Sequence, residues 1–117
     1  MAKWNGRNNC YSYAIDNPDK WMLINQDDYR EGVYTLLEAN PNFRLVSRNE
    51  IKLGKEYVAY RFSYNDFHFM KRGKDGHWRH KMGWSPVLAV STKFVFSKVW
   101  DCGSNVYTSK LYLFEVQ

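Results

Sequence analysis

Cys10 and the three histidines of the chain, His68, His77 and His80, are the residues whose types suit nucleophilic catalysis. The thiolate is the nucleophilic form of cysteine, and a histidine within hydrogen-bonding distance can remove the thiol proton. Cys10 follows an asparagine-rich loop and begins a predicted helix, where free N–H groups and the helix dipole lower the pKa of a thiol. The competing interpretation is that Cys10 is a small buried apolar residue among neighbouring tyrosines.

All three histidines fall in one predicted β-hairpin, and the length of its loop decides whether two of them share a face. A three-residue loop at 74–76, with Gly76 in the left-handed conformation, places His80 diagonal to His68 on the same face. A two-residue loop at 75–76 shifts the register by one and puts these two rings on opposite faces. Both loops fit the residues, and we favour the three-residue loop.

If the two rings share a face, the sequence predicts a catalytic group in which Cys10 is the nucleophile and His68 is the general base. His80 would then orient the His68 ring. The oxyanion would be held by the backbone N–H of Cys10 and by a side-chain amide just upstream. The candidates for that amide are Asn5, Asn8 and Asn9. The alternative is that His68 is a hydrogen-bonded strand residue and that the other two histidines face solvent.

The elements that must position these residues change type along the chain. Residues 8–15 and 27–40 fit two helices, the second with apolar residues at helical spacing and an Asn-Pro stop. From residue 43 onward the pattern is typical of strands. The predicted strands are Phe43–Val46, Tyr57–Phe62, Phe67–Lys71, His77–Lys81, Phe94–Trp100 and Tyr107–Val116. Helices followed by a mostly antiparallel sheet indicate an α+β fold, and the 117 residues, 1–117, make one domain.

The order of the chemistry-bearing residues resembles that in papain-like cysteine hydrolases of the NlpC type. In that family a cysteine begins a helix, a histidine follows on a central strand, and a second polar residue comes about a dozen positions later, as His80 follows His68 here. The resemblance implies a papain-like α+β domain, with N-terminal helices packed on a curved antiparallel sheet. It also implies a cysteine peptidase or amidase that hydrolyses an amide bond of a peptide through an acyl-enzyme.

A narrower resemblance is to a pattern in small uncharacterised bacterial and phage proteins. The matching segments are Asn9-Cys10-Tyr11-x-Tyr13-Ala14, Asp66-x-His68 and Asp75-Gly76-x-Trp78-x-His80-Lys81-x-Gly83. Together the two resemblances span about residues 5–85. The chain departs from the NlpC-type family at the nucleophile, where the usual Asp-Cys-Ser-Gly is replaced by Asn-Cys-Tyr-Ser.

The distribution of charge supports a second, non-catalytic function. The formal net charge is +5 at pH 7, and residues 59–117 carry all of the excess. Residues 71–81 combine cations with a tryptophan, a mixture that suits an acidic protein surface or the phosphates and bases of a nucleic acid. The candidate binding residues are Lys71, Arg72, Lys74, Trp78, Arg79 and Lys81. The alternative function is therefore a small phage-type inhibitor or binding protein, although the same charges also suit a solvated edge hairpin.

Other patterns limit the function classes. A hydrophobic fraction of 44% is typical of globular rather than disordered chains. The sequence lacks CxxC, HxxxH, GxSxG and glycine-rich phosphate motifs, so we predict neither a metal site nor a cofactor. It also lacks an apolar run of ~18 residues and an apolar leader, so we expect no membrane span and a cytoplasmic protein, or one delivered by a non-classical route. Cys10 and Cys102 fit free thiols in a reducing compartment, and a bridge between them is left open.

Overall fold

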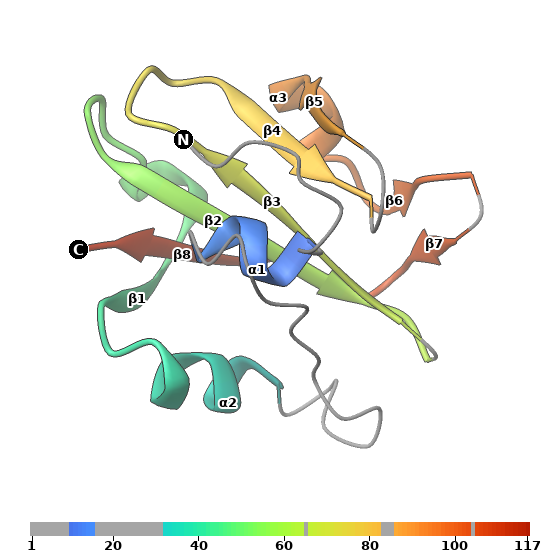
Figure 1. Ribbon diagram of the computed structural model, residues 1–117, viewed down its shortest axis with the longest axis horizontal. Helices are drawn as coiled ribbons and strands as arrows, with labels where there is room; N and C mark the ends of the chain where they lie inside the picture. Colours follow the sequence, from blue (N-terminus) through green and yellow to red (C-terminus); the bar gives the residue numbers. More distant parts are fainter. Residues whose placement is uncertain (1–9, 16–31, 65, 83–85, 104) are drawn as a thin grey trace.

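A six-stranded antiparallel sheet forms the centre of the computed structural model, which describes residues 10–15, 32–64, 66–82, 86–103 and 105–117 (Figure 1). The strand order is β1-β8-β2-β3-β4-β5. These strands are β1 (Phe43–Val46), β2 (Glu56–Phe62), β3 (Phe67–Arg72), β4 (Trp78–Lys81), β5 (Val87–Val90) and β8 (Tyr112–Val116). A separate two-stranded ribbon consists of β6 (Trp100–Asp101) and β7 (Val106–Tyr107).

The helices in the described part of the chain are short. They are α1 (Cys10–Ala14), α2 (Gly32–Ala39), the 3-10 helix η2 (Arg48–Glu50) and α3 (Thr92–Val95). Helix α1 packs on β3 and β4, and α2 contacts β1 (Figure 1). None of the helices that the structure describes has the length and apolar character needed to cross a membrane.

Side chains alternate along each strand, so the sheet has two packed faces. The helix face is covered by α1 and α2. The buried cluster on this face comprises Cys10, Ala14, Val33, Leu36, Phe43, Val58, Tyr60, Phe67, Phe69 and Phe114. The opposite face, here called the ribbon face, is covered by α3 and the β6–β7 ribbon. Its buried cluster comprises Val46, Tyr57, Ala59, Met70, Trp78, Val95, Trp100, Tyr107 and Leu113. Burying each large apolar side chain contributes ~1.5–3 kcal/mol, so both faces stabilise the sheet.

The first four predicted strands are confirmed to within one residue at each end as β1, β2, β3 and β4. The predicted strand Phe94–Trp100 is wrong, because the chain forms α3 there and only Trp100 enters a strand. The Ser91 hydroxyl caps α3 by accepting a hydrogen bond from the Phe94 N–H at 3.1 Å. The predicted strand Tyr107–Val116 is broken into β7 and β8, which join different sheets. Strand β5 was not predicted, because its four residues are all apolar and show no alternation.

The predicted α+β papain-like fold is wrong, because the structure is mostly antiparallel β. The helices α1, α2 and α3 have five, eight and four residues, so they form no helical layer comparable to the sheet. The predicted helix at 8–15 is confirmed for Cys10–Ala14. The helix predicted for 27–40 is confirmed for Gly32–Ala39, and residues 27–31 lie outside the described part of the chain.

The β3–β4 hairpin has the three-residue loop that the sequence favours. The Gly73 N–H donates to the His77 carbonyl at 3.1 Å, which closes the loop. Gly76 has a φ of 84°, a conformation that costs glycine little. The resulting register confirms that His68 and His80 lie on the same face of the sheet.

Candidate functional site

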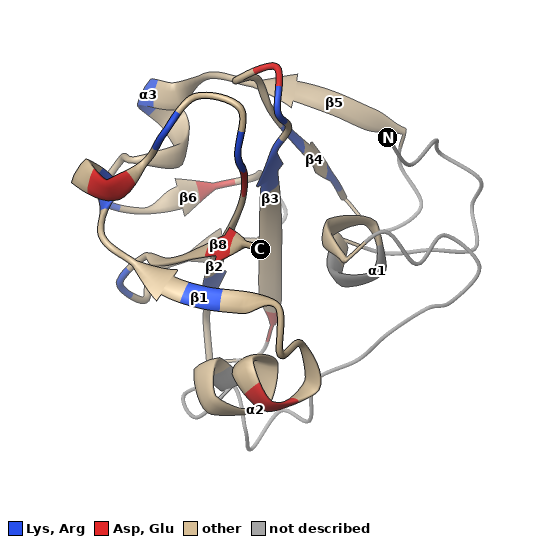
Figure 2. Cartoon of the chain, turned by 90° about the vertical axis from the view of Figure 1, so that its left-hand side faces the viewer, with Lys and Arg blue, Asp and Glu red and all other residues tan. Residues whose placement is uncertain are grey.

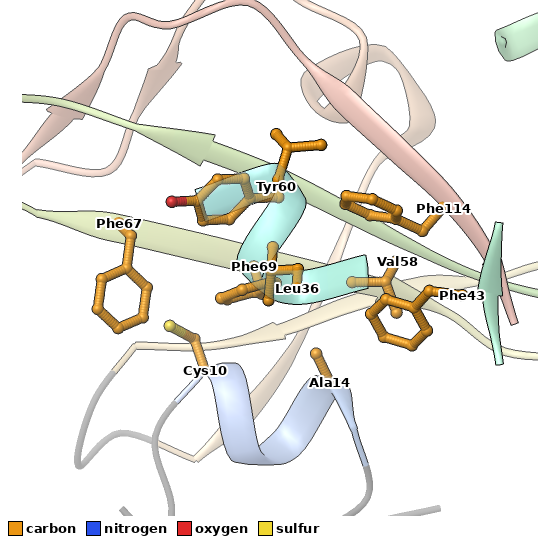
Figure 3. Close-up of a cluster of buried hydrophobic side chains, with 10 residues drawn as sticks. Cys10, Ala14, Leu36, Phe43, Val58, Tyr60, Phe67, Phe69 and Phe114 are labelled. Atoms are coloured by element: carbon orange, nitrogen blue, oxygen red, sulfur yellow. The ribbon is translucent and has the colours of Figure 1, made fainter. Parts of the chain in front are cut away.

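Cys10 begins α1 and lies on the helix face (Figure 3). Its side chain is 6% exposed and belongs to the apolar cluster that contains Phe67 and Phe69 of β3. Figure 3 shows the sulfur beside the ring of Phe67. The β3 side chains that share this cluster with Cys10 are thus the two phenylalanines.

His68 lies between these two phenylalanines in β3, so its ring projects to the ribbon face. The ring stacks on that of Tyr107, with ring centroids 5.3 Å apart. It also packs in a T-shaped arrangement with the Trp100 ring, with centroids 5.9 Å apart. Both partners belong to the ribbon-face cluster. The sheet therefore separates His68 from Cys10, and the structure does not form the nucleophile and base pair that the sequence predicts.

His68 and His80 do contact each other. His68 Nε2 and His80 Nδ1 are 3.0 Å apart, so one nitrogen donates its proton and the other accepts. Burial, with a smaller effect of His80, lowers the pKa of His68 to about 3. Burial also lowers the pKa of His80. The pair is therefore neutral at pH 7, and its predicted role in orienting a catalytic base stays a prediction.

The cysteine on the ribbon face is Cys102. It packs against the ribbon-face cluster, and burial together with Asp101 raises its pKa to about 11. A thiol with this pKa is protonated at neutral pH, so Cys102 is a poor replacement for Cys10 as a nucleophile. Both cysteines are free thiols, which settles the disulfide question that the sequence left open.

Arg61 is a buried cation on the ribbon face that the sequence analysis missed. It pairs with His68 across the β2–β3 ladder and is 4% exposed. One guanidinium nitrogen donates to the Ser97 carbonyl, and the group lies 5.3 Å from the centre of the Trp100 ring. Its Nε and Nη1 atoms have no hydrogen-bond partner among the described residues. The face of the sheet on which Arg61 lies could have been predicted from alternation along β2, because Tyr57, Ala59 and Arg61 are each two residues apart.

The ribbon is tied to the start of β3 by polar contacts that the sequence analysis also missed. The Tyr107 hydroxyl donates to Asp66 Oδ2 at 2.8 Å, and Asn105 Nδ2 donates to the same oxygen at 2.9 Å. Burial, followed by the interaction with Asp66, raises the pKa of Tyr107. The sequence has no pattern that predicts these contacts, because Asn105 and Tyr107 lie about forty positions after Asp66.

Lys81 is a charged residue that interacts electrostatically with Cys10. It lies in β4 and is fully buried. Burial lowers the pKa of Lys81, and the interaction with Cys10 partly offsets this effect. Lys81 therefore belongs to the interior beneath α1, and it is not part of the exposed surface predicted for the basic hairpin.

Two residues of the predicted basic surface are buried on the ribbon face. Trp78 is 2% exposed and packs edge-on against Phe96, with ring centroids 5.9 Å apart. Arg72 is 8% exposed and lies over the Tyr57 ring, 5.6 Å from its centre. Neither side chain is available to stack on a base or to neutralise phosphates along a nucleic acid.

The other three cations of the predicted basic surface, Lys71, Lys74 and Arg79, line one pocket. We call it the hairpin pocket; its volume is about 260 Å³. The remaining lining residues are Tyr13, Glu56, Gly73 and Asp75. Figure 2 shows Lys and Arg positions gathered where β3 and β4 meet at the hairpin. Sequence reasoning found the cations but missed Tyr13 and Glu56, which come from distant segments.

Two of the cations in the hairpin pocket are held by carboxylates. Arg79 Nη2 is 2.8 Å from Asp75 Oδ2, and Lys71 Nζ is 3.9 Å from Glu56 Oε2. Hydrogen bonding from Arg79 is the largest cause that lowers the pKa of Asp75 to about 2. Lys74 is exposed. Three cations and two carboxylates leave the lining with a net charge of +1.

The other residues that the sequence analysis singled out are His77 and the three candidate oxyanion residues. His77 is exposed, and its backbone N–H donates to Asp75 Oδ1 at 3.0 Å. The oxyanion candidates Asn5, Asn8 and Asn9 lie outside the described residues. Within the described ranges, no group of three or more His, Cys, Asp or Glu side chains is placed to hold a metal ion.

Comparisons of the chain with protein-family models, with curated proteins and with solved structures found no match in any of the three. The resemblance to NlpC-type hydrolases therefore stays a prediction, and the proposals below rest on the geometry of the chain itself.

Proposed function

We propose that this domain is a non-catalytic binding protein that takes an acidic side chain of a protein partner into the hairpin pocket. The observation that carries the proposal is the convergence of Lys71, Lys74 and Arg79 on one concave site beside Tyr13. The two functions predicted from the sequence make different demands on the structure. The binding function needs cations that line an open pocket, as Lys71, Lys74 and Arg79 do. The hydrolytic function needs a thiol beside an imidazole.

The hairpin pocket is preorganised for a carboxylate. Arg79 is fixed by its contact with Asp75, and Lys71 is buried beside Glu56 and 5.9 Å from the centre of the Tyr13 ring. Ordering these side chains before the ligand arrives lowers the entropic cost of binding. The exposed Lys74 supplies a cation at the mouth, which attracts an approaching acidic group.

The pocket favours an acidic protein segment over a nucleic acid. Its volume of about 260 Å³ lies below the ~300–1,000 Å³ of typical small-molecule sites, which suits a side chain better than a nucleotide. The carboxylates of Glu56 and Asp75 in the lining oppose a chain of phosphates, whereas one carboxylate can lie against the cations. The burial of Trp78 removes the stacking surface that single-stranded nucleic acids use.

Amide hydrolysis by Cys10 and His68 receives no support from this geometry. The apolar cluster around Cys10 and the aromatic cluster around His68 lie on opposite faces of the sheet. General-base catalysis needs the base within hydrogen-bonding reach of the proton that it removes. We therefore do not propose that the described residues carry this reaction.

Reversing the charge of Lys74 should weaken the binding of an acidic peptide about tenfold, which corresponds to ~1.4 kcal/mol. Lys74→Glu changes an exposed residue at the mouth of the hairpin pocket, so the fold should be retained. The affinity of a fluorescein-labelled peptide with alternating Glu and Gly residues is measured by fluorescence anisotropy, at low and at physiological ionic strength.

The matched control is Lys93→Glu, which makes the same charge change on an exposed residue of α3. It should change the affinity less than about twofold, and Cys10→Ala should also leave it unchanged. Equal weakening by both lysine variants would show non-specific charge attraction and contradict the proposal. Absence of saturable binding to the peptide, or tighter and saturable binding to a single-stranded oligonucleotide, would also contradict it.

A further inference from the structure

We infer that two copies of this chain associate through β5, which pairs antiparallel with β5 of the second copy. Strand β5 is one edge of the six-stranded sheet, and among the described strands β4 is its pairing partner. Figure 2 shows β5 at the top of the molecule, beyond β4. Its four residues, Val87–Val90, are all apolar. An uncharged edge strand offers its outward N–H and C=O groups to a strand of another chain.

The two edges of the sheet differ in charge. The other edge strand, β1, carries Arg44, whose Nη2 lies 3.4 Å from Glu115 Oε2 and whose Nη1 lies 3.6 Å from Glu50 Oε1. Charged side chains on an edge strand disfavour the addition of a further strand. Strand β5 carries no charge, and its Leu88 side chain is 50% exposed. A second copy therefore pairs at β5 without placing like charges opposite each other.

The ladder determines which backbone groups of β5 point outward. The His77 carbonyl accepts a hydrogen bond across the β3–β4 hairpin, so the backbone groups of His77 face β3. Those of His80, three positions later, face β5, where His80 pairs with Leu88. The backbone groups of Leu88 thus face β4. Those of Val87 and Ala89, before and after it, point outward.

This arrangement makes β5 complementary to itself. When Leu88 lies opposite Leu88 of the second copy, Val87 lies opposite Ala89 of the second copy. Each such pair exchanges two hydrogen bonds, because both residues direct their backbone groups at each other. Pro86, which has no N–H, lies opposite Val90 at a position that forms no bonds between the copies. A single two-fold register therefore uses all the outward groups of the strand.

The side chains at the centre of this interface are apolar. Leu88 pairs with His80 and so projects to the ribbon face. In the dimer the two Leu88 side chains cover each other, which removes apolar surface from water. The edge is four residues long. It is small beside the ~800 Å² per partner of stable complexes, so we expect a dissociation constant on the order of 0.1 mM.

The symmetry of the dimer determines where its hairpin pockets lie. Antiparallel pairing of two identical edges places the two-fold axis perpendicular to the sheet, so the helix faces of both copies are on the same side. The hairpin pocket lies on the helix face. Two pockets then open on one side of a continuous sheet. This consequence rests on the proposed function, whereas the dimer itself does not.

Disulfide cross-linking tests the register. The two Leu88 residues form a pair without hydrogen bonds, whose Cα atoms lie ~4.5 Å apart, within the range of a disulfide. Leu88→Cys should therefore form a covalent dimer about tenfold faster than Leu45→Cys. Leu45 is the matched control, because it is 48% exposed and lies on the other edge strand, β1. All variants also carry Cys102→Ser, which removes a half-buried free thiol.

Ala89→Cys is a second control for the register. Ala89 is exposed on the same strand, but it lies opposite Val87 of the second copy. The two Ala89 Cα atoms are then more than ~7 Å apart, too far for a disulfide without backbone movement. This variant should cross-link no faster than Leu45→Cys.

Sedimentation equilibrium tests the association without a cross-link. The mean mass of the unmodified chain should rise from that of one copy at ~10 µM toward that of two at ~1 mM. Added salt should strengthen the dimer, because it screens the repulsion between two chains of net charge +5. Leu88→Lys changes a half-exposed residue and should weaken the association at least about tenfold. Leu45→Lys is the matched control and should leave it unchanged, with circular dichroism as the check on folding.

The outcomes separate this inference from the proposed function. A mean mass of one copy at ~1 mM, or equal cross-linking of Leu88→Cys and Leu45→Cys, overturns the dimer and leaves peptide binding by a single hairpin pocket untouched. Faster cross-linking of Ala89→Cys than of Leu88→Cys overturns the inferred register. If the chain stays monomeric and Leu88→Lys weakens binding of the acidic peptide, β5 pairs with the ligand instead, and the inference also fails.

Discussion

The free energy of unfolding is expected to fall by about 2 kcal/mol as the pH is lowered from 6.5 to 4.5, because His68 must be neutral in the folded protein. Its ring is 2% exposed and lies between Tyr107, Trp100 and His80. Burial lowers the pKa of His68 to about 3, against about 6.5 in an unfolded chain. Each unit of difference corresponds to ~1.4 kcal/mol at full slope, and the slope is about half of that at pH 6.5, where the unfolded histidine is half protonated. Two pH units therefore give a loss of ~2 kcal/mol.

The direction of this effect follows from proton uptake. Below pH 6.5 the unfolded chain binds a proton at His68 that the folded protein does not bind, so acid favours unfolding. The loss continues until the pH reaches the folded pKa near 3. Protonation of carboxylates with a lowered pKa destabilises the fold in the same direction. This loss begins at about pH 4 for Asp75 and at about pH 4.5 for Glu50 and Glu115, at the lower end of the interval or below it. The interval from pH 6.5 to 4.5 therefore reports on the histidines.

Urea titrations at half-unit pH steps measure this effect. His68→Phe keeps an aromatic ring between Tyr107 and Trp100 but removes the His68 proton acceptor. Its stability should therefore fall less over the interval than that of the unmodified protein, and the loss that remains is caused by His80. His77→Gln removes one exposed histidine, and its pH dependence should match that of the unmodified protein. If the free energy of unfolding of the unmodified protein stays constant between pH 6.5 and 4.5, the inference that His68 and His80 are both neutral in the folded protein is contradicted.

Trp100→Ala should lower the free energy of unfolding by about 3–5 kcal/mol, the range for removal of a buried aromatic side chain. Trp100 is fully buried, and its Nε1–H donates to the Val95 carbonyl at 2.9 Å. Its ring also contacts His68 and lies beneath the Arg61 guanidinium. The substitution removes the largest side chain that holds the ribbon on the sheet and leaves Arg61 without its aromatic partner.

Denaturant unfolding measures the loss, and Trp100→Phe is the matched variant. It keeps a ring but removes the donor to Val95, so it should cost about half as much. Peptide binding well below the unfolding midpoint should be unchanged in both variants, because the hairpin pocket lies on the helix face. A loss below ~1 kcal/mol for Trp100→Ala would show that the ribbon does not depend on this residue.

The sequence predicted the local features of the sheet better than its overall fold. Alternation in Phe67–Lys71 and the glycine in the hairpin loop determined the register, since both are properties of adjacent residues. The helix at Thr92–Val95 was missed because aromatic and β-branched residues at 94–96 match a strand, whereas the Ser91 cap stabilises a helix. The resemblance to papain-like proteins led to an incorrect fold because it rests on a few residues that constrain local structure only.

The structure places Cys10 and His68 on opposite faces of the sheet, because alternation along β3 points His68 away from α1. The prediction needed His68 to face the helix that carries Cys10, and residue order alone does not say which side of β3 that helix covers. Long-range packing makes the choice, because α1 covers Phe67 and Phe69. Long-range packing also explains why only the cations of the hairpin pocket could be predicted from the sequence. Its cations come from one hairpin, whereas Tyr13 and Glu56 come from α1 and β2.

The most direct test of the binding function is a chemical-shift map of the ¹⁵N-labelled protein during titration with the Glu-containing peptide. The account predicts the largest shifts at the backbone amides of Gly73, Lys74 and Asp75, with little change at Cys10 and none at the His68 ring. Shifts centred on Cys10 and His68, with the hairpin unchanged, would contradict it.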